Sequence, residues 1–472
     1  MPPRYSPPEV SKHERSHRVV WALAWPAVAL NSLQVVNSVL DGGFVGHLDK
    51  ASLVAYGGMT PVLFLMFSFA MSLATAATAL VSRAYGAGDP GEYRMATRQS
   101  LSLSIVGGFV LSAACWVLAP IFARNLLPPT ATDSVPLMAQ FFRIYALGLP
   151  AIFVIQALAG SLRGVGDTRS PMVISGLQIL LHIALNVVLI FPTRTIGIFP
   201  VPGAGMGLMG AAAALAASAW VSAIIYLGYA GRTRLGRQWD IGIPNWDWVM
   251  RVIRIAVPAA VMSVLRVGSL TAFQLVLTRV PDGETAIAAL RCAFAIESMM
   301  FMPSFGLSMA ASALVGQSLG MEKPERAERL AWTAAHHAGI VTAVLAVPIF
   351  IFAEPLAGLM LGDKQAVIDQ AASLIRWLCV TEVMFAYAMV MIGAMQGAGD
   401  TKRPLWLTII CMWMMRVPLA YVLALPGSAA IFGWGVGMGA VGAWIAMSLT
   451  QAVQGALSII YFRQGHWTRV KV

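Results

Sequence analysis

The sequence predicts an all-α membrane protein with twelve transmembrane helices in two parallel, pseudo-symmetric six-helix lobes. Three observations predict this fold: 58% hydrophobic and only 11% charged residues, twelve long apolar runs, and an internal repeat with a spacing of 233 positions. Soluble domains carry roughly 25% charged residues. The alternating pattern of a transmembrane β-barrel is absent, so the apolar runs are expected to be helices.

The apolar runs set the number of spans. Each is long enough to cross a hydrocarbon core of about 30 Å, which takes about 20 helical residues. The runs lie near residues 19–45, 52–82, 99–123, 137–160, 172–192, 207–230, 252–278, 286–318, 330–353, 367–396, 405–425 and 440–462.

The repeat divides the chain into halves. GSLRGVGDTRSP at 160–171 returns as GAMQGAGDTKRP at 393–404, and LVSRAYGAGDP at 80–90 returns as LVGQSLGMEKP at 314–324. Six spans bring the chain back to the side on which it started, so the two copies are parallel, with a pseudo-two-fold axis along the membrane normal. The predicted parts are a tail (1–18), a first lobe (19–230), a linker (231–251), a second lobe (252–462) and a tail (463–472).

The net charge of +11 is explained by topology. Most Lys and Arg residues fall in the two tails and in the loops that twelve spans place on the same side as the tails. The positive-inside rule therefore predicts a multi-pass inner-membrane protein with both termini in the cytoplasm and no nucleic-acid partner. The four cysteines lie within apolar runs without metal-ligand spacing, which predicts packing residues and no metal or cofactor site.

The repeated GxGDT loops predict turns rather than a phosphate site. They lack the Lys-Ser/Thr pair of a P-loop and follow no strand. Asp167, Thr168 or Ser170 is expected to cap the fifth span, with Pro171 in its first turn.

Asp41 is the strongest functional candidate, because an ionisable residue at membrane depth is costly. Gln34 and Asn37 share its helix face at i−7 and i−4. Pro26 precedes them and is expected to allow a helix kink. We expect Asp41 to bind a proton or Na⁺ reversibly; the alternative is a water-exposed or capping carboxylate at the end of the span.

The fifth span carries a polar stripe of Gln178, His182 and Asn186 at successive i+4 steps. Such a stripe must face protein or water. It is expected either to line a cavity beside Asp41 or to join helices by hydrogen bonds.

The second lobe has its own ionisable residues at span depth. Arg266 and Glu297 lie on neighbouring spans, where an ion pair would be a structural bond or a gate. Glu382 has no evident partner and is a second candidate for cation coupling. Arg416 precedes Pro418 and is expected to be a structural group near the cytoplasmic end of its span.

The chain resembles the multidrug and toxic compound extrusion (MATE) family, prokaryotic branch. The resemblance covers nearly the whole chain. It rests on the GxxxGxGDTxxP repeat and on the stretches VLDGGFVGHLDKASLVAYGG (39–58), ALVSRAYGAGD (79–89), IESMMFMPSFGLSMAASALVGQSLG (296–320) and MQGAGDTKRPLW (395–406).

The resemblance implies a secondary antiporter that exports organic, often cationic, small molecules against H⁺ or Na⁺ by alternating access between two lobes. It implies cation coupling by Asp41 and bending of the first helix at Pro26. His182 and Asn186 stand where family members commonly place an Asn and an acid, so the acid is missing here. Arg266 stands where some members carry a coupling Glu, and could act as a tethered cation in its place.

These observations leave three other functions to weigh. A lipid-linked oligosaccharide flippase would need several cationic residues in its cavity. An integral-membrane enzyme would need clustered catalytic residues, whereas the seven His are scattered. A channel would need rings of charge. We therefore expect a monomeric, non-enzymatic exporter whose substrate contacts or gates include Gln34, Gln178, Arg266, Glu297 and Glu382.

Overall fold

The computed structural model describes residues 14–196, 199–236, 245–427 and 435–470. These residues contain twelve helices that are long and apolar enough to cross a membrane, which confirms the predicted fold class. The first six are α1 (Glu14–Gly46), α2 (Lys50–Gly86), α3 (Pro90–Leu126), α4 (Ser134–Gly164), α5 (Arg169–Ile190) and α6 (Leu208–Ala230). The second six are α7 (Trp246–Leu277), α8 (Gly283–Gly320), α9 (Pro324–Ile351), α11 (Gln365–Gly397), the span Lys402–Ala424 and α14 (Gly439–Arg463).

The eleventh span is not one regular helix. It consists of α12 (Lys402–Thr408), a π-helical segment η1 (Ile409–Arg416) and α13 (Val417–Ala424). A π-helix in the middle of a span is rare and is frequently found at functional sites. The hydrophobic run at 405–425 predicted the span but not this change of helix type, because both helix types are equally apolar.

The short elements lie between spans. A β-hairpin of β1 (Pro192–Ile196) and β2 (Phe199–Ala204) connects α5 to α6, and an isolated bridge pairs Pro426 with Val436 between α13 and α14. The short helix α10 (Ala353–Leu361) follows α9, and the 3₁₀ helix η2 (His466–Arg469) follows α14. Helices α1 and α7 begin at Glu14 and Trp246, inside the predicted tail and linker; residues 237–244 of that linker lie outside the described residues.

Acidic residues begin several helices. Asp49 accepts hydrogen bonds from the backbone N–H groups of Ala51 and Ser52 and from the Ser52 hydroxyl, and the Ser52 hydroxyl contributes most to lowering the pKa of Asp49. In the repeated loop, Asp167 accepts bonds from the Ser170 N–H (3.0 Å) and hydroxyl (2.6 Å). The prediction that this loop caps the fifth span is therefore confirmed, and the capping residue is Asp167.

The first helix of each half belongs to both lobes. Val20 and Ala24, in the first half of α1, are buried in a core cluster formed otherwise by second-lobe residues. Val252 and Ile255, in the first half of α7, are buried in the core cluster of the first lobe. Each of these helices therefore crosses from one lobe to the other along its length.

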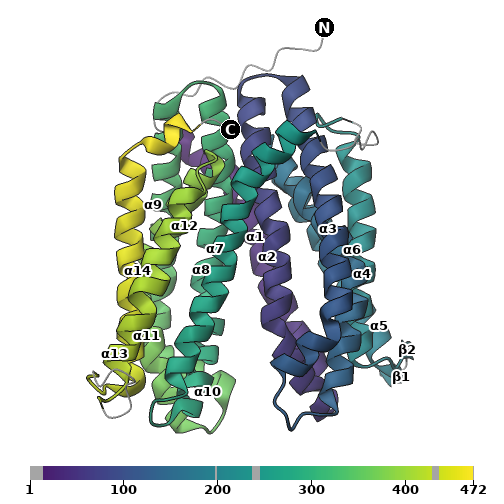
Figure 1. Ribbon diagram of the computed structural model, residues 1–472, viewed down its shortest axis with the longest axis vertical. Helices are drawn as coiled ribbons and strands as arrows, with labels where there is room; N and C mark the ends of the chain where they lie inside the picture. Colours follow the sequence, from purple (N-terminus) through teal and green to yellow (C-terminus); the bar gives the residue numbers. More distant parts are fainter. Residues whose placement is uncertain (1–13, 197–198, 237–244, 428–434, 471–472) are drawn as a thin grey trace.

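The two lobes meet at the end where α1 begins and α14 ends, and their ribbons diverge toward the opposite end (Figure 1). At the meeting end, α2 and α8 are in backbone contact. A Cβ atom on Gly86 would overlap the Gln317 carbonyl, and one on Gly320 would overlap the Arg83 carbonyl. Only glycine permits this approach, and the two glycines are equivalent positions of the repeat.

Two side chains at equivalent positions of the repeat bond across this contact. Gln317 Nε2 donates to the Gly164 carbonyl at the end of α4 (2.9 Å). Arg83 donates to the Ala398 carbonyl just after α11 (3.5 Å) and to the Val470 carbonyl after η2 (2.6 Å). The repeated motifs therefore hold the two lobes together at this end.

Replacing Gly320 by alanine should destabilise the protein, because the added methyl group overlaps the backbone of α2. Overpacking of this kind costs about 1–3 kcal/mol, so the unfolding temperature in detergent should fall. Gly228→Ala is the matched control, since a Cβ atom at Gly228 of α6 meets nothing within 4 Å. Equal unfolding temperatures for the two variants would contradict the proposed close contact.

Candidate functional site

The first candidate centre is built around Asp41 of α1. One carboxylate oxygen, Oδ1, lies 3.0 Å from His182 Nε2 and accepts a 2.8 Å bond from Asn186 Nδ2, both on α5. The other, Oδ2, accepts a 3.1 Å bond from Asn37 Nδ2, one turn earlier on α1. Three side chains from two helices therefore converge on one carboxylate, as the i+4 spacings on each helix indicated.

This centre is nearly enclosed. The side chain of Asp41 is 17% exposed and that of His182 is 7% exposed. Within the described residues, three buried polar atoms of this centre have no hydrogen-bond partner: Asn37 Oδ1, Asn186 Oδ1 and His182 Nδ1. The imidazole and the carboxylate can exchange one proton, and the two free carboxamide oxygens are ligands suited to a small hard cation.

The structure places His182 of the α5 stripe in direct contact with Asp41 and adds one residue. Tyr56 of α2 lies close enough to interact with the Asp41 charge and was not among the predicted residues. Its position on a different helix explains the omission, because sequence spacing relates only residues on the same helix.

The other predicted residues of the first lobe lie outside the Asp41 network. Gln34 is exposed and Gln178 is half-buried, and in the described part of the chain neither side chain bonds to Asp41. Pro26 is buried within a continuous α1, fifteen residues before Asp41. Pro26 therefore lies near the point at which α1 passes from one lobe to the other.

A second polar centre lies in the other lobe. Gln451 of α14 donates to Glu297 Oε1 of α8 (3.1 Å) and accepts a bond from Thr381 of α11 (3.3 Å). Glu382 of α11 is 1% exposed, and among the described residues its Oε2 atom is buried without a hydrogen-bond partner. Its charge interacts with that of Glu297, which places Glu382 beside this centre.

Arg416 belongs to this second centre. It is the last residue of η1, 8% exposed, and its Nε donates to the Thr450 hydroxyl of α14 (3.0 Å). Its charge interacts with that of Glu297. The span begins at Lys402 and ends at Ala424, so Arg416 lies fourteen residues after its start, well inside the span.

Arg266 and Glu297 do not form the ion pair that their neighbouring spans suggested. Among the described residues, the ion pairs are those of Asp41, Glu92 and Asp400. Glu297 instead accepts a 3.1 Å bond from Gln451. The sequence prediction of this centre missed α14, whose polar residues Thr450, Gln451 and Gln454 form a stripe that can be recognised in the sequence.

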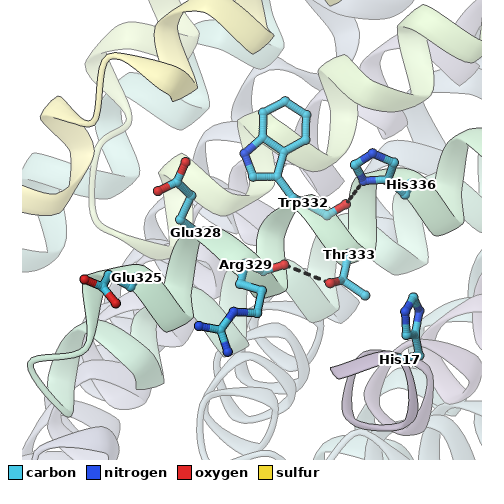
Figure 2. Close-up of a pocket in the computed structure, with 7 residues that line it drawn as sticks. All are labelled: His17, Glu325, Glu328, Arg329, Trp332, Thr333 and His336. Carbon is cyan, nitrogen blue, oxygen red and sulfur yellow. Dashed lines mark hydrogen bonds between the residues drawn. The ribbon is translucent and has the colours of Figure 1, made fainter. Parts of the chain in front are cut away.

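A cavity of about 390 Å³ lies outside both centres, between α9 and the start of α1 (Figure 2). Close by, His17 bonds to His337 of α9 (2.8 Å), while His336 bonds to the Trp332 carbonyl. No group of three potential metal ligands occurs among the described residues. The residues that line the cavity are His17, Glu325, Glu328, Arg329, Trp332, Thr333 and His336.

Comparison with known protein families identifies the family to which this chain belongs. The MatE family model matches residues 26–188 and 258–422, one match in each half. This chain belongs to the MatE family. The two matches begin at Pro26 and Pro258, which agrees with the internal repeat.

Individual relatives of this MatE chain match along nearly all its length. The probable multidrug resistance protein NorM of Thermotoga maritima is 28% identical over 475 residues, covering 99% of this chain and 95% of the relative. Two solved structures share the fold at 22% identity: a MATE protein in complex with MaL6 (TM-score 0.85; 95% and 96% of the two chains) and an outward-facing multidrug resistance MATE family transporter (TM-score 0.82; 95% and 95%).

Replacing Gln451 by leucine should destabilise this MatE chain, because it leaves Glu297 Oε1 without the hydrogen bond that Gln451 donates. Unsatisfied buried polar groups cost about 1–3 kcal/mol each. Gln34→Leu is the control, since Gln34 is exposed and outside both centres. Thermal unfolding in detergent should show a clear decrease for Gln451→Leu alone; a decrease of the same size in both variants would argue against the second centre.

Proposed function

We propose that this protein is an inner-membrane multidrug exporter that works as a secondary antiporter, taking up H⁺ as an organic compound leaves. The observation that carries the proposal is the contact of Asp41 with His182 at membrane depth. The names of the relatives, as multidrug resistance proteins, support the transport class. They also fit a protein that is not an enzyme.

The proton is favoured because an imidazole and a carboxylate in contact are both groups that can bind a proton. A proton that enters from the outer side and binds the Asp41 carboxylate removes its charge and weakens the bonds that hold α1 to α5. Na⁺ is the second candidate ion, because Asn37 Oδ1 and Asn186 Oδ1 are buried beside the Asp41 carboxylate and accept no hydrogen bond from any residue that the structure describes.

Helix α1 connects the Asp41 site of the first lobe to the core of the second lobe. Its second half is bonded to α5 through Asp41, while its first half packs in the second lobe through Val20 and Ala24. Between them, Gly306 of α8 contacts the Val28 backbone, two residues after Pro26. We propose that protonation releases the second half of α1, that the helix bends at Pro26, and that the bend changes the space between the lobes.

For the space between the lobes to open at the end where α1 begins, the contact of α2 with α8 must separate. Gln317 and Arg83 must release the Gly164 and Ala398 carbonyls for the lobes to separate at this end. The positive-inside charge bias suggests that this end is cytoplasmic. In the structure, the cytoplasmic end is therefore proposed to be closed and the outer end open.

The substrate is proposed to be a small amphiphilic organic compound that binds between the lobes, in contact with residues such as Gln34 and Gln178. Glu297 and Glu382 are proposed to take part in gating or in a second coupling step. The two arginines at span depth, Arg266 and Arg416, leave lipid-linked oligosaccharide flipping as a second candidate function, since guanidinium groups bind pyrophosphate.

Asp41→Asn should abolish gradient-driven efflux from proteoliposomes, because a carboxamide keeps the size of the side chain but cannot exchange a proton. We expect a decrease of at least tenfold in substrate flux under an imposed pH gradient. Asp369→Asn is the control, since Asp369 is an acid of α11 that bonds only locally to Gln365. Unchanged flux in folded Asp41→Asn protein would remove Asp41 from the mechanism.

A further inference from the structure

The start of α1 meets the middle of α9 through two histidines that the Asp41 mechanism does not use. His17 Nδ1 lies 2.8 Å from His337 Nε2, and the two ring centroids are 4.9 Å apart with an interplanar angle of 37°. Trp21, one turn after His17, has its ring nearly perpendicular to that of His337 at a centroid distance of 6.0 Å. His17 also lines the cavity against α9 (Figure 2), so the contact is next to a space that solvent can occupy.

The His17–His337 contact holds fewer protons than two separate imidazoles can bind. A hydrogen bond between two ring nitrogens needs a hydrogen on one of them and a free lone pair on the other. When both rings are protonated, two N–H groups face each other and the contact becomes repulsive. His337 Nδ1 is buried without a partner among the described residues, so an imidazolium at this position would also carry an unsatisfied N–H group.

No carboxylate in the described part of the chain is in contact with either ring to compensate a second positive charge, because the ion pairs there are those of Asp41, Glu92 and Asp400. His336 is engaged elsewhere, by the Trp332 carbonyl. Residues 298–320 of α8, which packs against both helices, carry no charged side chain. The titratable and charged groups around the contact are Arg18 of α1, Glu325, Glu328, Arg329 and His336 of α9, Tyr387 of α11, and Tyr461 and Arg463 of α14.

The contact lies where α1 is anchored in the second lobe. Val20 and Ala24, three and seven residues after His17, are buried in the core cluster of that lobe. The second half of α1 is held in the first lobe by Asp41. Both ends of this helix are therefore held by contacts whose strength depends on protonation.

We propose that the His17–His337 contact is a pH-sensitive switch that frees the start of α1 from α9 when the cytoplasm becomes acidic. The separated rings bind one proton more than the paired rings, so a fall in pH favours separation. The limiting effect of one additional proton is about tenfold in the equilibrium per pH unit. Histidine titrates between about pH 5 and 8, which includes the range of cytoplasmic acidification.

As regulation of transport, this inference rests on the proposed function. An exporter that takes up H⁺ acidifies the cytoplasm as it works. Bending of α1 moves one lobe against the other only while the first half of the helix stays fixed in the second lobe. Separation of His17 from His337 therefore weakens the link between Asp41 and the second lobe, and slows proton uptake when the cytoplasm is already acidic.

The test is hydrogen–deuterium exchange of the purified full-length protein in detergent, measured by mass spectrometry. Protection of residues 16–24, corrected for the intrinsic pH dependence of exchange, is compared between about pH 7.5 and about pH 5.5, across the range in which histidine titrates. We expect protection to fall at least about fivefold at the lower pH. Peptides from α4, which contains no histidine, should keep their protection and so exclude global unfolding.

Substitutions of the two histidines locate the effect. His337→Gln should abolish the pH response, because a carboxamide bonds to His17 without binding a proton itself. His17→Gln should do the same, and it serves as the second variant if His337→Gln does not fold. His336→Gln is the matched control: this histidine is adjacent in sequence but bonds to the Trp332 carbonyl, so the wild-type response should remain.

Equal protection of the wild-type α1 peptides at both pH values would overturn the switch. A full pH response in both His337→Gln and His17→Gln would also overturn it. These measurements need no gradient, so they do not depend on the exporter proposal. A preserved switch in a protein without gradient-driven flux would contradict the exporter proposal alone.

The regulatory role is tested by flux in proteoliposomes at a constant pH difference, with the pH of both compartments lowered together. Wild-type flux should fall about threefold more than that of His337→Gln, because only the wild-type protein loses the anchor of α1. Equal decreases in the two proteins would contradict the regulatory role.

Discussion

The hydrogen bonds that Asp41 accepts from His182 and Asn186 determine where the second half of α1 lies. A carboxylate at membrane depth must be satisfied by neighbouring donors, because lipid offers none. In this chain the donors come from α5, so α1 is tied to the first lobe by its carboxylate and to the second lobe by Val20 and Ala24. Protonation of Asp41 in the second half of α1 would therefore alter the contact between the two lobes.

The residues that the two halves share form the contact between the lobes, whereas the polar centres consist of residues that differ between the halves. Equivalent glycines, Gly86 and Gly320, permit the backbone contact of α2 with α8, and the equivalent side chains of Arg83 and Gln317 bond across it. The polar centres are not equivalent. The first lobe has one carboxylate with an imidazole, whereas the second has two carboxyl groups and the guanidinium group of Arg416.

Much of the fold was predictable from the sequence, because apolar run length and the repeated loops report directly on spans and symmetry. The Asp41–Asn37 and His182–Asn186 contacts were indicated by i+4 spacing on single helices. Partners on different helices were harder to foresee: Tyr56 near Asp41, and Gln451 between Glu297 and Thr381, depend on packing. The π-helical segment that places Arg416 within the second centre has no hydrophobic signature of its own.

The central claim is that proton transfer at Asp41 and His182 drives export. The most direct measurement is substrate flux in proteoliposomes under a pH gradient and, separately, under a Na⁺ gradient of equal magnitude. The account predicts that the pH gradient alone drives accumulation of substrate against its concentration gradient. Flux driven by Na⁺ at zero pH gradient, with no response to the pH gradient, would contradict it.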